Sequence, residues 1–136
     1  MMWPKDDNLD AAPDDVADLY RVGGIIDAVQ AVSECGQACL SCADACLSEE
    51  MVAELRECIR FSLDCADVCR AAVTIASRHT GPNRDVVRKV LEACALACRS
   101  CADECERYAQ RLDHCRECVE SCTRCAAACR TALWVM

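Results

Sequence analysis

The sequence Cys94-Ala-Leu-Ala-Cys98-Arg-Ser-Cys101-Ala-Asp-Glu-Cys105 places four cysteines at intervals of four, three and four residues. In an α-helix these intervals bring the side chains onto one face, at the a and d positions of a helical bundle. Neither glycine nor proline interrupts the stretch, and the alanine and charged residues between the cysteines suit a helix with one solvated face. The stretch therefore predicts a helix whose buried seam is made of sulfur.

Three further stretches carry the same spacing, and together they hold the other twelve of the 16 cysteines. The first contains Cys35, Cys39, Cys42 and Cys46; the second contains Cys58, Cys65 and Cys69, with Ser62 at the missing position; the third contains Cys115, Cys118, Cys122, Cys125 and Cys129. Four seams joined by short connections predict an all-α fold, an antiparallel up-down four-helix bundle with a cysteine-lined core.

The limits of the elements follow from turn and capping residues. Residues 1–24 are expected to form a partly ordered N-terminal extension with a short helix that Gly23-Gly24 ends. The bundle is expected over residues 25–134. Its first helix is predicted over 25–47, its second from an N-cap at Ser48 to residue 77, its third up to Tyr108, and its fourth from a cap at Asp113 to Trp134.

Alignment of the four seams in alternating directions predicts layers across the bundle. From one end to the other the layers are Cys39, Cys58, Cys105 and Cys118; then Cys35, Ser62, Cys101 and Cys122; then Val32, Cys65, Cys98 and Cys125; then Ala28, Cys69, Cys94 and Cys129. Beyond the last layer we expect an apolar end, made of Ile25, Ala72, Ala76, Val87, Leu91, Leu133 and Met136. The opposite, cysteine end is expected to hold Cys42, Cys46, Met51, Leu55, Tyr108, His114 and Cys115.

Composition narrows the classes of function. A chain of 136 residues is expected to form one domain, and its formal charge of −8 argues against nucleic acid as a partner and favours cations. No apolar run approaches the roughly 20 residues of a membrane span, and the acidic N-terminus lacks the apolar segment of an export signal. We therefore expect a cytoplasmic protein without a membrane association, in a compartment where thiols stay reduced. No catalytic triad, phosphate-binding loop or nucleotide motif is present, so an enzyme is not expected.

Two ordinary explanations of the cysteines fit poorly. Residues four apart on a helix have Cβ atoms about 5–6 Å apart, whereas a disulfide needs about 3.8 Å, so only bridges between helices are open. Cysteine as a small hydrophobic core residue is credible at one or two positions. It does not explain why nearly every seam position toward the cysteine end is cysteine while the other end is aliphatic.

Metal binding accounts better for the pattern. Structural zinc commonly uses cysteine pairs on loops, and iron–sulfur clusters commonly use cysteines on irregular backbone. Repeated pairs four residues apart on continuous helices suit Cu(I), a soft, thiolate-selecting ion that accepts low coordination numbers. Because bare thiolates cannot be buried in such number, the empty core should hold neutral thiols, and each Cu⁺ can replace one proton.

The candidate ligands are all the cysteines, together with one histidine and one methionine near the cysteine end. They are Cys35, Cys39, Cys42, Cys46, Met51, Cys58, Cys65, Cys69, Cys94, Cys98, Cys101, Cys105, His114, Cys115, Cys118, Cys122, Cys125 and Cys129. His79, near the turn at the apolar end, is expected to be a solvated loop residue. Val52, Ile59 and Leu63 on one flank of the second helix, and Phe61, Val68 and Ile75 on the other, exceed what one seam needs and indicate a further subunit or helix.

The four cysteine runs, and His114-Cys115-Arg-Glu-Cys118 among them, resemble the bacterial four-helix-bundle copper storage proteins over about residues 25–133. The resemblance implies a homotetramer of bundles, each of which fills its core with multiple Cu(I) ions, and the absence of an export signal is similar to the cytosolic members. The chain departs from that family in having Ser62 where a cysteine is usual and Tyr108 where a further histidine is common.

The function predicted on these grounds is cytosolic storage and detoxification of Cu(I). Two alternatives stay open: a thiol-disulfide redox protein and an iron–sulfur or zinc protein. Cys115-Arg-Glu-Cys118 is the candidate redox motif, since such motifs pair two cysteines near a helix N-terminus.

Overall fold

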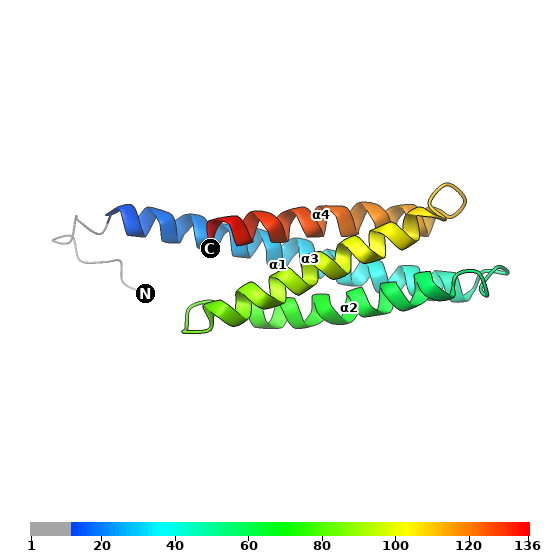
Figure 1. Ribbon diagram of the computed structural model, residues 1–136, viewed down its shortest axis with the longest axis horizontal. Coiled ribbons are helices and arrows are strands. Elements are labelled where there is room, and N and C mark those ends of the chain that lie inside the picture. Colours follow the sequence, from blue (N-terminus) through cyan, green and yellow to red (C-terminus); the bar gives the residue numbers. More distant parts are fainter. Residues whose placement is uncertain (1–11) are drawn as a thin grey trace.

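The computed structural model describes residues 12–136, which fold into four α-helices. Helix α1 spans Ala12–Leu47, α2 spans Arg56–Ala76, α3 spans Arg84–Glu106 and α4 spans Asp113–Val135. Each helix packs against its neighbours in chain order, and α4 packs back against α1 to close the ring (Figure 1). No strand occurs between residues 12 and 136. The predicted all-α, up-down four-helix bundle is therefore confirmed.

The cysteine seams form the core of this bundle. All 16 cysteines are at most 1% exposed, and they lie in one cluster with the aliphatic residues of the apolar end. There Ile25, Ala72, Ala76, Val87 and Leu91 are fully buried, while Leu133 and Met136 are half-buried. The connection over residues 77–83 and the last residues of α4 lie at this end, and the connections over 48–55 and 107–112 lie at the cysteine end (Figure 1).

Helix α1 differs from the prediction because it does not break at Gly23-Gly24. Neither glycine has a positive φ, and the helix continues through both without interruption. Gly24 has a packing reason instead: a Cβ there would lie 3.0 Å from Cγ2 of Val135 and 3.4 Å from Cα of Ala132. The close approach of α1 to the end of α4 therefore accounts for glycine at this position. The first turns of α1 extend past the end of α4 (Figure 1). Residues 1–11 of the predicted extension lie outside the described residues.

The two connections at the cysteine end also differ from the prediction. Ser48 does not cap α2: residues 48–55 form consecutive turns with bonds such as Leu55 N–H to the Val52 carbonyl at 3.0 Å, and α2 begins only at Arg56. Asp113 does not cap α4 either, since Leu112 is the N-cap residue and Asp113 instead accepts a hydrogen bond from Arg116 at 3.0 Å. Tyr108 lies after the end of α3. Capping preferences alone place the ends of these helices wrongly, because the buried side chains of Leu55 and Tyr108 hold the two connections in compact turns.

None of the helices in the described part of the chain combines the length and the apolar character that crossing a bilayer requires.

Candidate metal centre

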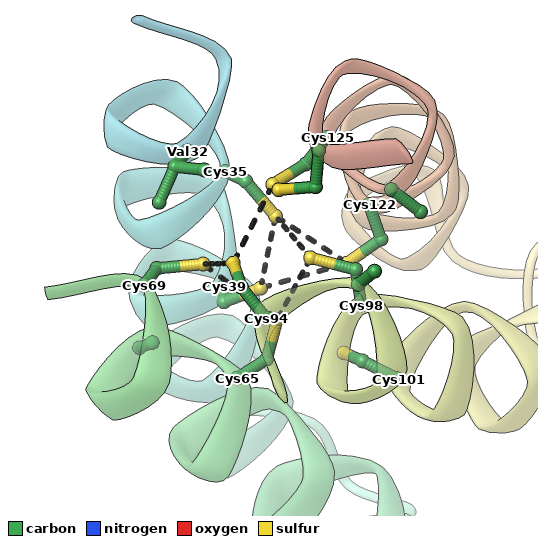
Figure 2. Close-up of a cluster of buried hydrophobic side chains, with 14 of the residues drawn as sticks. Val32, Cys35, Cys39, Cys65, Cys69, Cys94, Cys98, Cys101, Cys122 and Cys125 are labelled. Atoms are coloured by element: carbon green, nitrogen blue, oxygen red, sulfur yellow. Dashed lines mark hydrogen bonds between the residues drawn. The ribbon is translucent and has the colours of Figure 1, made fainter. Parts of the chain in front are cut away.

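The four helices direct their cysteine side chains toward one another along the axis of the bundle. Figure 2 shows the middle of this column, where sulfur atoms from all four helices meet around a common centre. Because each seam follows the a and d positions, successive sulfurs stack along every helix, and pairs four residues apart approach to 3.9–4.0 Å, as in Cys35–Cys39 and Cys118–Cys122.

Contacts between helices confirm at least one predicted pair in each layer. In the first layer Sγ of Cys58 lies 3.1 Å from Sγ of Cys105, and Cys39 lies 3.9 Å from Cys118. In the second layer Cys35 lies 3.7 Å from Cys122. The third and fourth layers contain the pairs Cys65–Cys98 at 3.6 Å and Cys69–Cys94 at 3.8 Å.

Several groups of four buried sulfurs have all their members within 4.8 Å of one another, a separation at which one metal ion can bind them together. Such groups include Cys42, Cys46, Cys58 and Cys115; Cys39, Cys101, Cys118 and Cys122; and Cys69, Cys94, Cys98 and Cys125. Since a metal–thiolate bond is about 2.3 Å long, an ion between two sulfurs spans at most about 4.6 Å. The column can therefore accept soft metal ions with small side-chain adjustments.

Ser62 interrupts this column as the sequence predicts. It is fully buried, and its Oγ lies 3.6 Å from Sγ of Cys101 and 3.8 Å from Sγ of Cys105. A hydroxyl is a hard donor and a poor ligand for a soft ion, so this position supplies no equivalent of the missing thiolate.

His114 joins the thiols at the cysteine end. Its Nε2 lies 3.4 Å from Sγ of Cys46, and its Nδ1 lies 3.9 Å from a carboxylate oxygen of Glu49. Metal-binding histidines commonly place a carboxylate beside their second nitrogen, where it fixes the orientation of the ring. The imidazole is 21% exposed, so His114 is both adjacent to the column and accessible to solvent. Sequence reasoning missed Glu49, because the 48–55 segment was expected to be helical.

Met51 and Tyr108, which the sequence places at the cysteine end, lie in the connections there and take no part in the column of sulfurs. Met51 is half-buried and packs on the core from the 48–55 connection, and it takes part in no side-chain hydrogen bond within residues 12–136. Tyr108 is only 5% exposed, and its hydroxyl donates a hydrogen bond to the carbonyl oxygen of Glu54 at 2.9 Å. Its ring also lies beside the guanidinium groups of Arg107 and Arg111, each 5.6 Å from the ring centre. Tyr108 thus ties the two connections of the cysteine end together.

His79 lies in the connection at the apolar end, away from the thiols, but it is not the solvated residue expected. Its side chain is half-buried, and its Nδ1 is buried without a hydrogen-bond partner among the described residues. It lines a small hollow with Ile25, Val29 and Ala76.

Burial controls the protonation of the outermost thiols. Burial raises the pKa of Cys46, and the neighbouring Cys42 and Cys58 add to the shift because thiolates would repel one another. At the other end a hydrogen bond with Cys125 lowers the pKa of Cys129, but the bond with Cys94 and burial outweigh it and raise that pKa to about 12. Both thiols therefore stay protonated at neutral pH in the absence of metal.

Comparison with known proteins places this arrangement in context. Residues 24–134 match the family model described as Copper storage protein. The chain is 47% identical to a cytosolic copper storage protein from Streptomyces lividans solved with five coppers, over 84% of this chain and 95% of that one, with a TM-score of 0.82. The same Streptomyces lividans protein, Ccsp, loaded with 10 copper equivalents aligns at 47% identity over 84% of this chain and 86% of that one, also with a TM-score of 0.82.

A third solved structure, the Cu(I)-bound copper storage protein BsCsp3, is 33% identical over 78% of this chain and 94% of that one, with a TM-score of 0.69. No curated protein matches the chain. The four cysteine seams, the layered bundle and the family-model match over most of the sequence lead to one conclusion. This chain belongs to the copper storage protein family.

Proposed function

We propose that this protein stores Cu(I) in the cytosol and thereby protects the cell from the free ion. The observation that carries the proposal is the column of 16 buried thiols, in which neighbouring sulfurs lie 3.1–4.0 Å apart. Thiolates can bridge two metal ions, so the column can hold on the order of one ion per thiol. The chain's relatives that carry several coppers support the proposal.

Charge favours Cu(I) over zinc in this core. One Zn²⁺ bound by four thiolates leaves two negative charges. The cost of burying them is high because no Lys or Arg is among the buried residues of the described chain. One Cu⁺ per thiolate leaves no net charge and releases one proton for every ion bound. The geometry accepts either ion, but only Cu(I) can fill the whole column without accumulating charge.

A redox enzyme fits the site less well. The candidate nucleophile Cys115 is fully buried, whereas reactive cysteines are partly exposed and have a depressed pKa. A hydrogen bond with Cys105 lowers the pKa of Cys115, but the bonds with Cys42 and Cys58 and burial outweigh it and raise the pKa. These features argue against a role for Cys115-Arg-Glu-Cys118 in disulfide exchange, and we assign no catalytic residue.

The proposed copper ligands are the 16 cysteines, with His114 as a further ligand during uptake. Ions should enter at the cysteine end, because His114 and Cys46 are adjacent there and aliphatic side chains fill the other end. Met51 packs on the core without a hydrogen bond to a thiol among the described residues, so it is proposed only as a weak, transient ligand.

The experiment that tests the storage function is an anaerobic titration of the reduced protein with Cu(I) against a chromophoric chelator, combined with metal analysis. We expect more than ten Cu(I) per chain and no comparable uptake of zinc. Saturation at one or two ions would refute storage and would favour a discrete metal site. Colour and iron in the purified protein would favour the iron–sulfur alternative.

The proposed assembly is a homotetramer. Leu63 on α2 is 43% exposed, and Val52, in the connection before α2, is 36% exposed. Four more apolar residues of α2 are half-buried: Ile59, Phe61, Val68 and Ile75. Apolar surface of this extent on one helix is typical of a subunit interface. Leu63→Glu should lower the mass measured by light scattering, whereas Leu96→Glu on α3, where the side chain is 57% exposed, serves as the matched control. A wild-type mass of one chain would refute the tetramer.

A further inference from the structure

Cys58 and Cys105 are an unusually close pair of thiols in the column. Their sulfur atoms lie 3.1 Å apart, whereas those of Cys69 and Cys94, which also join α2 to α3, lie 3.8 Å apart. Because Cys58 and Cys105 are on different helices, a bond between their sulfurs avoids the distortion that a bridge within one helix would need. The pair is therefore placed to form a disulfide.

The movement that a disulfide requires is smallest for close pairs. The bond is about 2.05 Å long, so the sulfurs of Cys58 and Cys105 must approach by about 1 Å, and those of Cys69 and Cys94 by about 1.8 Å. In a close-packed core the neighbouring side chains have to absorb that movement. Ser62 also reduces competition, since its Oγ lies 3.8 Å from Sγ of Cys105 and a hydroxyl forms no disulfide. Oxidation of the empty column should therefore begin at Cys58 and Cys105.

A succession of contacts joins this pair to the end at which we propose that ions enter. Nε2 of His114 lies 3.4 Å from Sγ of Cys46, and Cys46 lies 3.9 Å from Cys115. The next sulfur along the succession is that of Cys58, 4.0 Å from Cys115. Both members of the close pair are fully buried, so a large oxidant cannot reach them. A metal ion at the cysteine end can, because every step between it and the pair is short.

Copper(II) is the oxidant whose chemistry suits this end of the bundle. Among the divalent ions of the first transition series, Cu²⁺ binds a given set of nitrogen and sulfur donors most tightly, and imidazole is a suitable ligand for it. The formal charge of −8 also attracts a divalent cation. Thiolates prefer the softer Cu⁺. A Cu²⁺ ion that reaches the thiols is therefore in surroundings that favour its reduction.

We propose that the empty protein reduces Cu(II) to Cu(I) and in doing so forms a disulfide between Cys58 and Cys105. Each of two Cu²⁺ ions accepts one electron. The two S–H bonds break and one S–S bond forms, so two Cu²⁺ and two thiols give two Cu⁺, one disulfide and two protons. Retention of the Cu⁺ by the remaining thiols rests on the proposed storage function, but the reduction does not. The reaction consumes both thiols, so neither is a catalytic residue.

The test is the addition of two Cu(II) per chain to the reduced, metal-free protein under anaerobic conditions. The Cu(II) signal in electron paramagnetic resonance should disappear, because Cu⁺ has no unpaired electron. After denaturation in mild acid with a chelator, N-ethylmaleimide should leave two of the 16 cysteines unlabelled. Zn(II) in place of Cu(II) is the control and should leave every cysteine free to react, since zinc has no redox chemistry. A persistent Cu(II) signal, or complete labelling after Cu(II), would overturn the inference.

Peptide mapping identifies the bridge. Trypsin releases Cys58 in the peptide 57–60, and it releases Cys105 in the peptide 100–107 together with Cys101. In the Cys101→Ser variant the second peptide holds Cys105 as its single cysteine, so a link between the two peptides defines the bridge. We expect this link in most of the oxidised protein. A predominant bridge between any other two cysteines would show that the inference is wrong.

Rates make the test specific to this pair. Cys105→Ser and Cys58→Ser should each slow the loss of the Cu(II) signal at least about fivefold, because the sulfurs that remain must move farther to pair. Cys94→Ser is the matched control: it removes one thiol of the wider Cys69–Cys94 pair between the same two helices, so the rate should stay as it was. Circular dichroism verifies that each variant is folded. Equal rates in all three variants would overturn the role of the close pair.

Direct titration of the reduced protein with Cu(I) separates this inference from the storage function. Uptake of many Cu(I) ions, with no bridge formed by Cu(II), would overturn the reduction and leave storage intact. Formation of the Cys58–Cys105 bridge in a protein that saturates at one or two Cu(I) would support the reduction and refute storage.

Discussion

The empty protein should unfold sharply when the pH rises above the ordinary pKa of a thiol. Ten thiols have a pKa raised in the folded state by burial and by hydrogen bonds with neighbouring thiols: Cys39, Cys46, Cys69, Cys98, Cys105, Cys115, Cys118, Cys122, Cys125 and Cys129. In the unfolded chain the same groups ionise near pH 8.5. Groups of this kind stabilise the fold below their unfolded pKa, and the stability is lost as the pH rises toward the folded pKa.

The magnitude follows from the number of thiols. Between pH 8.5 and 9.5 each thiol that ionises only in the unfolded chain lowers the free energy of unfolding by about 1 kcal/mol, so ten lower it by up to about 10 kcal/mol. The other six cysteines have a pKa lowered by hydrogen bonds with neighbouring thiols, so they add nothing to this loss. Because a domain has a total stability of about 5–15 kcal/mol, most of the stability should disappear within one pH unit.

Urea unfolding of the reduced protein under anaerobic conditions, followed by circular dichroism at closely spaced pH values, measures this loss. The midpoint should fall steeply from pH 8.5 and recover when the sample returns to pH 7. The Cu(I)-loaded protein is the control, since a sulfur bound to copper has no proton to lose, and its midpoint should stay nearly constant. A metal-free protein whose midpoint is unchanged up to pH 9.5 would contradict the reasoning.

Three further outcomes are expected. Far-UV circular dichroism should barely change on filling with Cu(I), because protonated thiols and the aliphatic end already pack the empty bundle; a large gain of helix would mean that folding depends on metal. Cys101→Ser should remove only one or two ions in a Cu(I) titration, since the other 15 cysteines remain, and loss of all binding would point to one discrete site. His114→Ala should slow exchange with a chelator at nearly unchanged capacity and Tyr108→Ala should speed it, whereas acceleration by Leu91→Ala alone would reverse the direction of uptake.

The arrangement of the core could be predicted from the sequence because the cysteine spacing carries two kinds of information. The intervals of three and four residues give the helix and its buried face, and the short connections give the alternating direction that sets one seam against the next. Pairs such as Cys65–Cys98 and Cys69–Cys94 follow from these two facts alone.

The connections could not be predicted in the same way. Ser48 and Asp113 are favourable capping residues, but the chain uses neither, because buried Leu55 and the bond from Tyr108 to the Glu54 carbonyl hold the two connections in compact turns. Gly23-Gly24 looks like a helix end, yet Gly24 lies where α1 closely approaches Val135. The placement of Glu49 beside His114 depends on these same turns, so it could not be predicted either.

A store of this kind must be stable both empty and full, and its sequence meets the two demands at different places. Protonated thiols pack as small apolar groups when the core is empty, and copper-bound thiolates carry no net charge when it is full. The aliphatic residues at the other end, such as Leu91 and Val87, bind no metal and hold the helices together in either state. His114 and the neighbouring thiol of Cys46 therefore lie at the end where we propose that ions enter, and the apolar end can stay closed throughout filling and release.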